Sequence, residues 1–289
     1  MRRAAAWACG LVAASLVGHA RGADEAVPAL GGRADRAAPA PLWELGLGAA
    51  ALRLPDYRGS DQSRTYLLPL PYIVYRGEWL RADRDGARAL LLKADRLKVD
   101  VSVAASVPTR SRDNDARSGM PNLPATVEIG PNVNYELLQS ADRRMRLELR
   151  LPVRAAVAVQ RSPPAVGATF SPNLNLDLKG AYGWNVGLLA GPLFADRKYH
   201  EHFYGVDAAY ATPQRPEYHA RGGYAGWHAL GAVSRRFGSA WVGGFVRYDS
   251  LGGAVFAASP LVRRDHEVTA GIGISWVFAT SRRLVTTDD

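Results

Sequence analysis

The densest run of side chains that could carry out chemistry is DRKYHEHFYGVD, at positions 196–207. On an extended strand, the spacing of His200 and His202 would put both imidazoles on one face, where they could bind a transition metal. With Glu201 or Asp207 they could also serve as general acid or base at the rim of a barrel. The sequence dictates neither a third ligand nor a nucleophile beside a base. We therefore expect a structured loop with stacked aromatic rings, without metal, cofactor or enzymatic activity.

A second polar motif is LPDYRGSD, at positions 54–61. Asp56 and Asp61 are carboxylates of the kind that bind Ca²⁺, but nothing else in the motif resembles a calcium loop. Its proline, glycine and serine are typical of a tight turn. A turn is the simpler interpretation.

A third set of charges alternates with apolar residues in RMRLELRLPVRAAVAV, at positions 144–159. A helix would scatter these two sets around its axis, so the period of two predicts a strand. Lipid would contact one face, formed by Met145, Leu147, Leu149, Leu151, Val153, Ala155, Val157 and Val159. The other face carries Glu148 and a basic strip of Arg144, Arg146, Arg150 and Arg154. Facing a barrel lumen, this strip would either brace the interior through ion pairs or line an anion-selective path.

The same alternation recurs from residue 42 onward and defines the elements that position these motifs. The predicted strands are 42–53, 66–75, 78–84, 88–93, 97–106, 126–138, 143–159, 169–179, 182–195, 223–237, 240–250 and 266–278. Short gaps mostly alternate with long ones, a pattern that favours an outer-membrane barrel over a soluble sandwich. We predict an all-β fold: a transmembrane, antiparallel, up-and-down β-barrel of about twelve strands, with ten as the alternative. An even number places both termini in the periplasm.

The N-terminus has the three parts of a secretory signal peptide at 1–20, with cleavage after Ala20. A flexible periplasmic lead-in is expected at 21–41, the barrel at 42–278 and a periplasmic tail at 279–289. The single cysteine, Cys9, lies in the signal peptide, which excludes a disulfide scaffold and thiol catalysis in the mature chain.

Net charge and composition restrict the classes of partner that the protein is expected to bind. The formal net charge of +9 favours anionic partners, but no nucleic-acid-binding module is recognisable, and a secreted chain is in the wrong compartment for one. Aromatic residues near strand ends suit membrane interfaces, so outer-membrane lipid and lipopolysaccharide are the expected surroundings.

Several stretches resemble the MipA/OmpV family of outer-membrane proteins: LPDYRGSDQSRTYLLPLPYIVYRG, SGMPNLPATVEIGPNVNYEL, GPLFADRKYHEHFYGVDAAYATPQRPEYHARGGYAG and FVRYDSLGGAVFAASPLVRRDHEVTAGIGISWVFA. Together they span nearly all of the mature chain in the family's order. The matching motifs contain residues to which the resemblance gives no role: Asp56, Tyr57, Gly59, Ser60, Asp61, Tyr199, Tyr204, Gly205, Arg247, Tyr248 and Asp249.

The resemblance implies an integral barrel in the outer membrane of a Gram-negative cell. It also implies a scaffold that joins an MltA-type lytic transglycosylase to a bifunctional penicillin-binding protein. Two alternatives stay open: a narrow channel for small anionic solutes, and a rim enzyme or metal-binding barrel. The chain departs from the usual barrel pattern after Phe278, where an aromatic residue closes the last predicted strand but ATSRRLVTTDD follows.

Overall fold

The structure, a computed structural model, describes residues 40–76, 80–83 and 86–285. The predicted signal peptide with its cleavage after Ala20, the lead-in up to residue 39 and the last four residues of the tail lie outside the described residues. None of the helices in the described part of the chain is long and apolar enough to span a bilayer.

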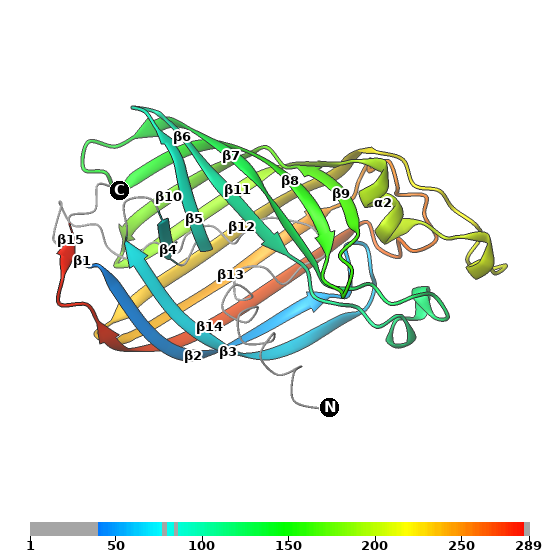
Figure 1. Cartoon of the computed structure of the whole chain (residues 1–289), viewed down its shortest axis with the longest axis horizontal. Coiled ribbons are helices and arrows are strands. Elements are labelled where there is room, and N and C mark those ends of the chain that lie inside the picture. The colour runs from blue at the N-terminus through cyan, green and yellow to red at the C-terminus, as the bar shows by residue number, and fades with distance from the viewer. Residues whose placement is uncertain (1–39, 77–79, 84–85, 286–289) are drawn as a thin grey trace.

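The described strands form a closed antiparallel barrel (Figure 1). Its sheet has thirteen strands in the order β10-β11-β12-β13-β14-β2-β3-β4-β5-β6-β7-β8-β9, and it closes because β10 also pairs with β8. The strands are β2 (Trp43–Pro55), β3 (Ser63–Arg76), β4 (Leu80–Asp83), β5 (Gly86–Lys93), β6 (Leu97–Ala105), β7 (Thr126–Gln139), β8 (Met145–Ala158), β9 (Ala165–Phe170), β10 (Asn173–Ala181), β11 (Trp184–Ala195), β12 (Gly223–Phe237), β13 (Ala240–Ser250) and β14 (His266–Thr280).

The segment predicted as one strand at 169–179 is two strands, β9 and β10. Both pair with β8 on one side and with β11 on the other, so they share one position in the wall. Thirteen strands with one shared position give the twelve positions that the sequence predicts. The interruption falls at Ser171 and Pro172, where proline offers no N–H to the ladder.

The wall alternates between an apolar outer face and a more polar inner face, as β14 illustrates. Ile272, Trp276 and Phe278 are more than half exposed, whereas Thr269 and Ser275 are buried. A closed barrel pairs most of its backbone hydrogen-bonding groups within the wall, and such an outer face presents apolar side chains to lipid. The chain is therefore an outer-membrane β-barrel, and the predicted fold class is confirmed.

Strand β4 is the shortest strand of the barrel wall, with four residues. Within the described residues β3 pairs with β4 only at Tyr75 and Arg76. The free part of β3 contains Pro69 and Pro71, which are tolerated where a strand edge has no ladder partner for their missing N–H.

The two ends of the barrel differ in their connections (Figure 1). One end has tight turns, and the other has long loops with helix α2 (Arg197–Tyr204) and the 3₁₀ turns η1 (Ser111–Asp113), η2 (Asp115–Arg117) and η3 (Ala208–Tyr210). We call these the turn end and the loop end.

Both described termini lie at the turn end and pair with each other. Strand β1 (Ala40–Pro41) is hydrogen-bonded to β15 (Leu284–Val285), and the Leu42 amide donates to the Arg283 carbonyl at 2.9 Å. Strand β14 runs two residues past Phe278, and Ser281 donates to Trp43 at 2.9 Å. The described part of the predicted tail is thus joined to the lead-in.

Candidate functional site: the barrel interior and the loop end

The predicted basic strip enters the interior at Arg146, Arg150 and Arg154, each opposed by acceptors. Arg150 lies 3.0 Å from a Glu148 oxygen and 3.6 Å from Asp177. Arg146 lies 3.8 Å from Glu136 and 3.8 Å from Glu148. The charges of Arg146 and Arg150 are therefore compensated by acids on β7, β8 and β10.

The buried end of the strip is Arg154, which is 3% exposed. Its guanidinium donates to Ser102 Oγ at 2.8 Å and to Ser171 Oγ at 3.3 Å. Arg144, predicted on the same strip, lies outside the lumen because β8 begins one residue later, at Met145. Its side chain is 65% exposed, in the turn, 3.9 Å from Asp142.

The opposite wall of the lumen is apolar. Strands β2, β3, β12, β13 and β14 contribute one hydrophobic cluster: Ala50, Leu70, Tyr72, Val74, Leu230, Ala232, Trp241 and Val277. At the turn end of this wall, buried Glu44 accepts from Arg76 at 2.7 Å and also pairs with Arg236. The interior is therefore amphipathic: β6, β7, β8 and β10 carry charges along the lumen, whereas the buried charges of the apolar wall lie toward its two ends, at Glu44 and at Arg247 and Asp249.

A second hydrophobic cluster occupies the loop end and joins strands to loops. Among its members are Tyr57, Leu123, Phe203, Tyr204, Phe256 and Leu261, each no more than 4% exposed. Ala156, Leu193 and Ala225 bring β8, β11 and β12 into the same cluster. We call this packed set of loop and strand side chains the loop cap.

The first family motif is pinned inside the loop cap by contacts distant in sequence. Tyr57 Oη donates to the Leu261 carbonyl at 2.8 Å, and burial raises the pKa of this phenol. The Gly59 carbonyl accepts from the Arg263 amide at 2.7 Å, and the Gly59 amide donates to Glu267 at 3.1 Å. Gly59 has a φ of +87°, a left-handed conformation that favours glycine.

The same motif joins a buried ionic cluster on β13. Asp249 accepts from Arg247 at 2.6 and 2.8 Å, and Arg58 Nε lies 3.3 Å from Asp249 Oδ1. All three side chains are no more than 3% exposed. Residues that the sequence left without a role thus form one charge cluster between loop and wall.

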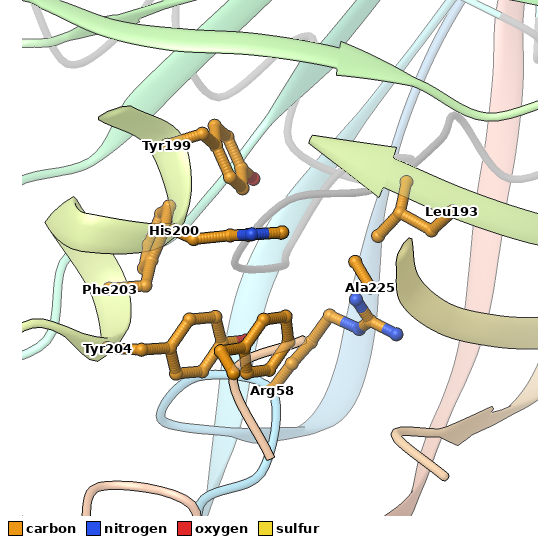
Figure 2. Close-up of a pocket in the computed structure, with 8 residues that line it drawn as sticks. Arg58, Leu193, Tyr199, His200, Phe203, Tyr204 and Ala225 are labelled. Carbon is orange, nitrogen blue, oxygen red and sulfur yellow. The ribbon is translucent and has the colours of Figure 1, made fainter. Parts of the chain in front are cut away.

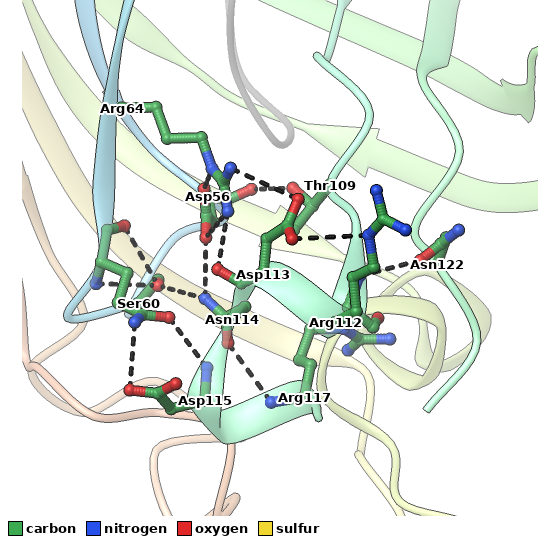
Figure 3. A network of polar contacts seen from close by, with 12 residues as sticks. Asp56, Ser60, Arg64, Thr109, Arg112, Asp113, Asn114, Asp115, Arg117 and Asn122 are labelled. Carbon is green, nitrogen blue, oxygen red and sulfur yellow. Dashed lines mark hydrogen bonds and ion pairs between the residues drawn. The ribbon is translucent and has the colours of Figure 1, made fainter. Parts of the chain in front are cut away.

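Asp56 has the role of a hydrogen-bond acceptor, as Figure 3 shows. It accepts from Arg64 Nε at 2.7 Å and from Asn114 Nδ2 at 2.9 Å, and Asn114 also donates to Ser60 Oγ at 3.1 Å. Asp61 is exposed. Because Asp56 is engaged by these donors, the motif ties two loops together and the turn interpretation holds over a calcium loop.

The expectation that His200 and His202 share one face of a strand is wrong. Both lie on helix α2, where residues two apart point about 200° apart around the axis. The helix begins at this point because Asp196 caps it, accepting from the Tyr199 amide at 2.7 Å. No group of three or more His, Cys, Asp or Glu residues that could hold a metal occurs in the described part of the chain.

The two histidines differ in their surroundings: His200 is buried and His202 is half-buried. His200 Nδ1 lies 2.6 Å from the Arg221 carbonyl, while its Nε2 has no hydrogen-bond partner. The ring points from α2 into a small cavity bordered by Arg58 and Ala225 (Figure 2). The volume of this cavity is about 10 Å³. Burial lowers the pKa of both histidines, and that of His202 to about 4.

The remaining motif residues separate into interior and outer positions. Tyr199 Oη donates to Glu128 at 3.0 Å, and the Tyr204 ring stacks on Phe256 at 3.7 Å. Gly205 ends helix α2, and a Cβ there would lie 2.6 Å from the Glu201 carbonyl oxygen. Tyr248 is 38% exposed on the outer face, 5.7 Å from Trp227, and belongs to the outward register.

Comparison with known proteins identifies the family. The family described as "MltA-interacting protein MipA" matches residues 47–278, most of the chain. The chain belongs to this family. A search of curated proteins finds no match.

Solved structures similar to this MipA-family chain have low sequence identity to it, and they include a porin, a secretin and a channel. The NanC porin is 7% identical with a TM-score of 0.40, over 80% of this chain and 98% of that one. A bacterial polysaccharide outer-membrane secretin is 10% identical with a TM-score of 0.38, over 83% and 99%. The CymD monoaromatic hydrocarbon channel is 11% identical with a TM-score of 0.34, over 82% and 89%.

Several important residues of this MipA-family barrel were missed by sequence reasoning. Arg58 stands inside the first motif but its partner is on β13, and Glu128 receives Tyr199 and Thr169 at 3.0 Å each. Arg117 donates to the Phe203 carbonyl at 3.1 Å, and burial lowers its pKa to about 10. Glu128 was marked only by being a single charge in an apolar run, and Arg58 and Arg117 lie among other charged residues that hide them.

Proposed function

We propose that this MipA-family barrel is a non-enzymatic scaffold that holds murein-hydrolysing and murein-synthesising enzymes at the periplasmic face of the outer membrane. The family description, MltA-interacting protein, supports a partner of the lytic transglycosylase type. The bifunctional penicillin-binding protein as second partner follows the family resemblance of the sequence. Lipid and lipopolysaccharide would surround the apolar outer face.

The observation that carries this proposal is the loop cap. Its hydrophobic cluster joins loops to β8, β9, β11 and β12, and a buried ionic cluster fastens it to β13. A solute path through this end would have to open a close-packed core. This arrangement favours a function on the outside of the barrel.

The turn end is the proposed periplasmic end. Twelve strand positions return the chain to the end at which it starts, and a secreted chain starts in the periplasm. Membrane-impermeant maleimide labelling tests this, since the only cysteine of the sequence is Cys9, in the predicted signal peptide. Ala211→Cys at the loop end should react on intact cells, and Tyr182→Cys only after the outer membrane is permeabilised.

Crosslinking in intact cells followed by affinity purification tests the scaffold itself. The tagged barrel should recover a lytic transglycosylase and a murein synthase well above a control that expresses an unrelated tagged barrel. Recovery of neither enzyme above that control contradicts the proposal.

A narrow channel for small anionic solutes is the second candidate. Its support is the interior position of Arg146, Arg150 and Arg154. The acids beside Arg146 and Arg150 weaken it, because a compensated strip gives little attraction to a passing anion. A planar-bilayer conductance measurement distinguishes the channel from the scaffold.

A further inference from the structure

Two residues at the turn end adopt a backbone conformation that their side chains disfavour. In the described part of the chain, Arg143 and Tyr182 are the non-glycine residues with positive φ, at 56° and 51°. Left-handed backbone crowds the Cβ of every residue except glycine, and asparagine or aspartate tolerates it best. Such outliers concentrate at functional positions, where another requirement outweighs the strain.

Tyr182 occupies the place where the turn would favour asparagine. Ala181 pairs with Trp184, so Tyr182 and Gly183 form a two-residue hairpin loop with both φ angles positive. Asn-Gly is the preferred sequence of such a turn. The tyrosine side chain is fully exposed, at 101% of its reference area, and therefore gains nothing from the barrel.

Arg143 stands in the neighbouring turn, between β7 and β8. The two turns are neighbours because β8 and β10, the strands beside them, pair with each other, and the Lys179 amide of β10 donates to the Arg144 carbonyl at 2.7 Å. Arg143 is exposed, like Tyr182. Tyrosine and arginine are the residue types that, with tryptophan, most often dominate the binding energy of protein interfaces.

The surroundings of these two residues are basic. Arg144 and Lys179 join the two turns, and the guanidinium of Arg235 lies against Gly183. One acid lies among them: Asp142 of the β7–β8 turn accepts from Ser140 at 2.5 Å and lies 3.9 Å from Arg144, which leaves cations in excess. A role for Tyr182 as a membrane-interface aromatic residue is less suitable. Trp184 already supplies an outward aromatic residue on β11, and Tyr182 lies beyond the end of that strand, farther from the lipid.

We propose that the turns at 140–144 and 180–183 form a docking surface for an acidic protein partner, anchored by Tyr182 and Arg143. The inference rests on the proposed scaffold function and assigns the surface that performs it. A partner would bring a shallow apolar pocket for the phenol ring and carboxylates for the arginine, which an Arg side chain binds with directional hydrogen bonds.

The test compares Tyr182→Asn and Arg143→Asn in the otherwise intact mature barrel. Asparagine suits both turns, so each variant should fold at least as well as the wild type. Gly238→Asn is the matched control: Gly238 lies in another turn of the same end, has a φ of +57°, and a Cβ there meets no atom within 4 Å. Heat-modifiable gel mobility verifies folding, and Tyr182→Gly replaces the asparagine variant if that one misfolds.

Affinity is measured between the barrel in lipid nanodiscs and a purified MltA-type lytic transglycosylase, at two salt concentrations. Tyr182→Asn should weaken binding at least about tenfold and Arg143→Asn severalfold, while Gly238→Asn binds like the wild type. Wild-type binding should fall as salt rises, because the partner is acidic.

The outcomes separate the inference from the proposed function. Equal binding by the wild type and a Tyr182→Asn/Arg143→Asn double variant overturns the docking surface and leaves the scaffold intact. Weaker retention of the variants in lipid vesicles, with unchanged enzyme binding, makes Tyr182 a membrane anchor and also overturns it. A wild-type barrel that does not bind the lytic transglycosylase contradicts the scaffold, and the docking surface with it.

Discussion

The loop end and the turn end use arginine and tyrosine in opposite ways. At the loop end Tyr57, Arg58 and Arg247 are no more than 3% exposed, and Tyr57 and Arg247 make hydrogen bonds of 2.6–2.8 Å. At the turn end Arg143 and Tyr182 are exposed on left-handed backbone. Polar groups at the loop end hold loops to the wall.

This difference indicates where the fold leaves room for function. A buried, satisfied group is explained by the stability it supports, since an unpaired buried charge is costly. Stability does not explain an exposed residue on a strained backbone, so the choice of its side chain requires another explanation. The architecture therefore accounts for the loop end, while the turn end presents residues that the barrel does not need.

The largest expected effect comes from breaking the buried ionic cluster. Asp249→Ala leaves Arg58 and Arg247 without their shared carboxylate, and the loss of one partner of a buried pair costs about 3–5 kcal/mol. Asp142→Ala at the turn end removes an exposed acid, and we expect no measurable change. Guanidinium unfolding in lipid vesicles measures the free energy of unfolding of both variants. Equal stability of the two variants would contradict the proposed difference between the two ends.

The next effect concerns which face of β8 meets lipid. Leu149→Arg places a charge on the outer face near mid-bilayer and should cost about 2–4 kcal/mol. Arg150→Leu should cost less, although it leaves Glu148 and Asp177 with fewer donors. Folded yield and heat-modifiable gel mobility measure both. If Arg150→Leu fails to fold while Leu149→Arg folds normally, the assignment of the two faces of β8 is inverted.

The smallest effect is a pH dependence confined to the loop end. Burial lowers the pKa of His202 from 6.5 to about 4 and also lowers that of His200. Between these pH values the unfolded chain binds more protons than the folded chain, so stability falls as the pH falls through this window. Hydrogen exchange of α2, corrected for intrinsic rates, should rise from pH 7 to pH 5, and less in His202→Gln. Turn-end amides should show no such rise.

The barrel itself could be predicted because its determinants are local. Alternation in β8 and β14 is visible in the sequence, and both strands lie where it predicts them. The interruption between β9 and β10 was not predicted, because leucine continues to alternate with polar residues after Pro172 and the segment therefore resembles one uninterrupted strand. Helix α2 was missed because two histidines at i, i+2 resemble a strand face, although Asp196 was an available capping signal.

The candidate site was less predictable because its contacts join distant segments. Arg58 meets Asp249, and Tyr57 meets Leu261, only after the barrel closes and sets the register of β13 beside β14. The family resemblance selected both motifs but not their pairing. Backbone strain at Arg143 and Tyr182 depends on turn geometry, which short gaps between strands indicate without fixing φ.

Planar-bilayer conductance tests the central claim, a barrel that is closed at its loop end, most directly. The purified mature barrel should insert and show no discrete conductance steps, and Arg150→Glu should behave the same, because the loop cap blocks passage in both. Stable, anion-selective steps in the wild type that Arg150→Glu reduces or reverses would contradict the closed barrel and make the channel its function.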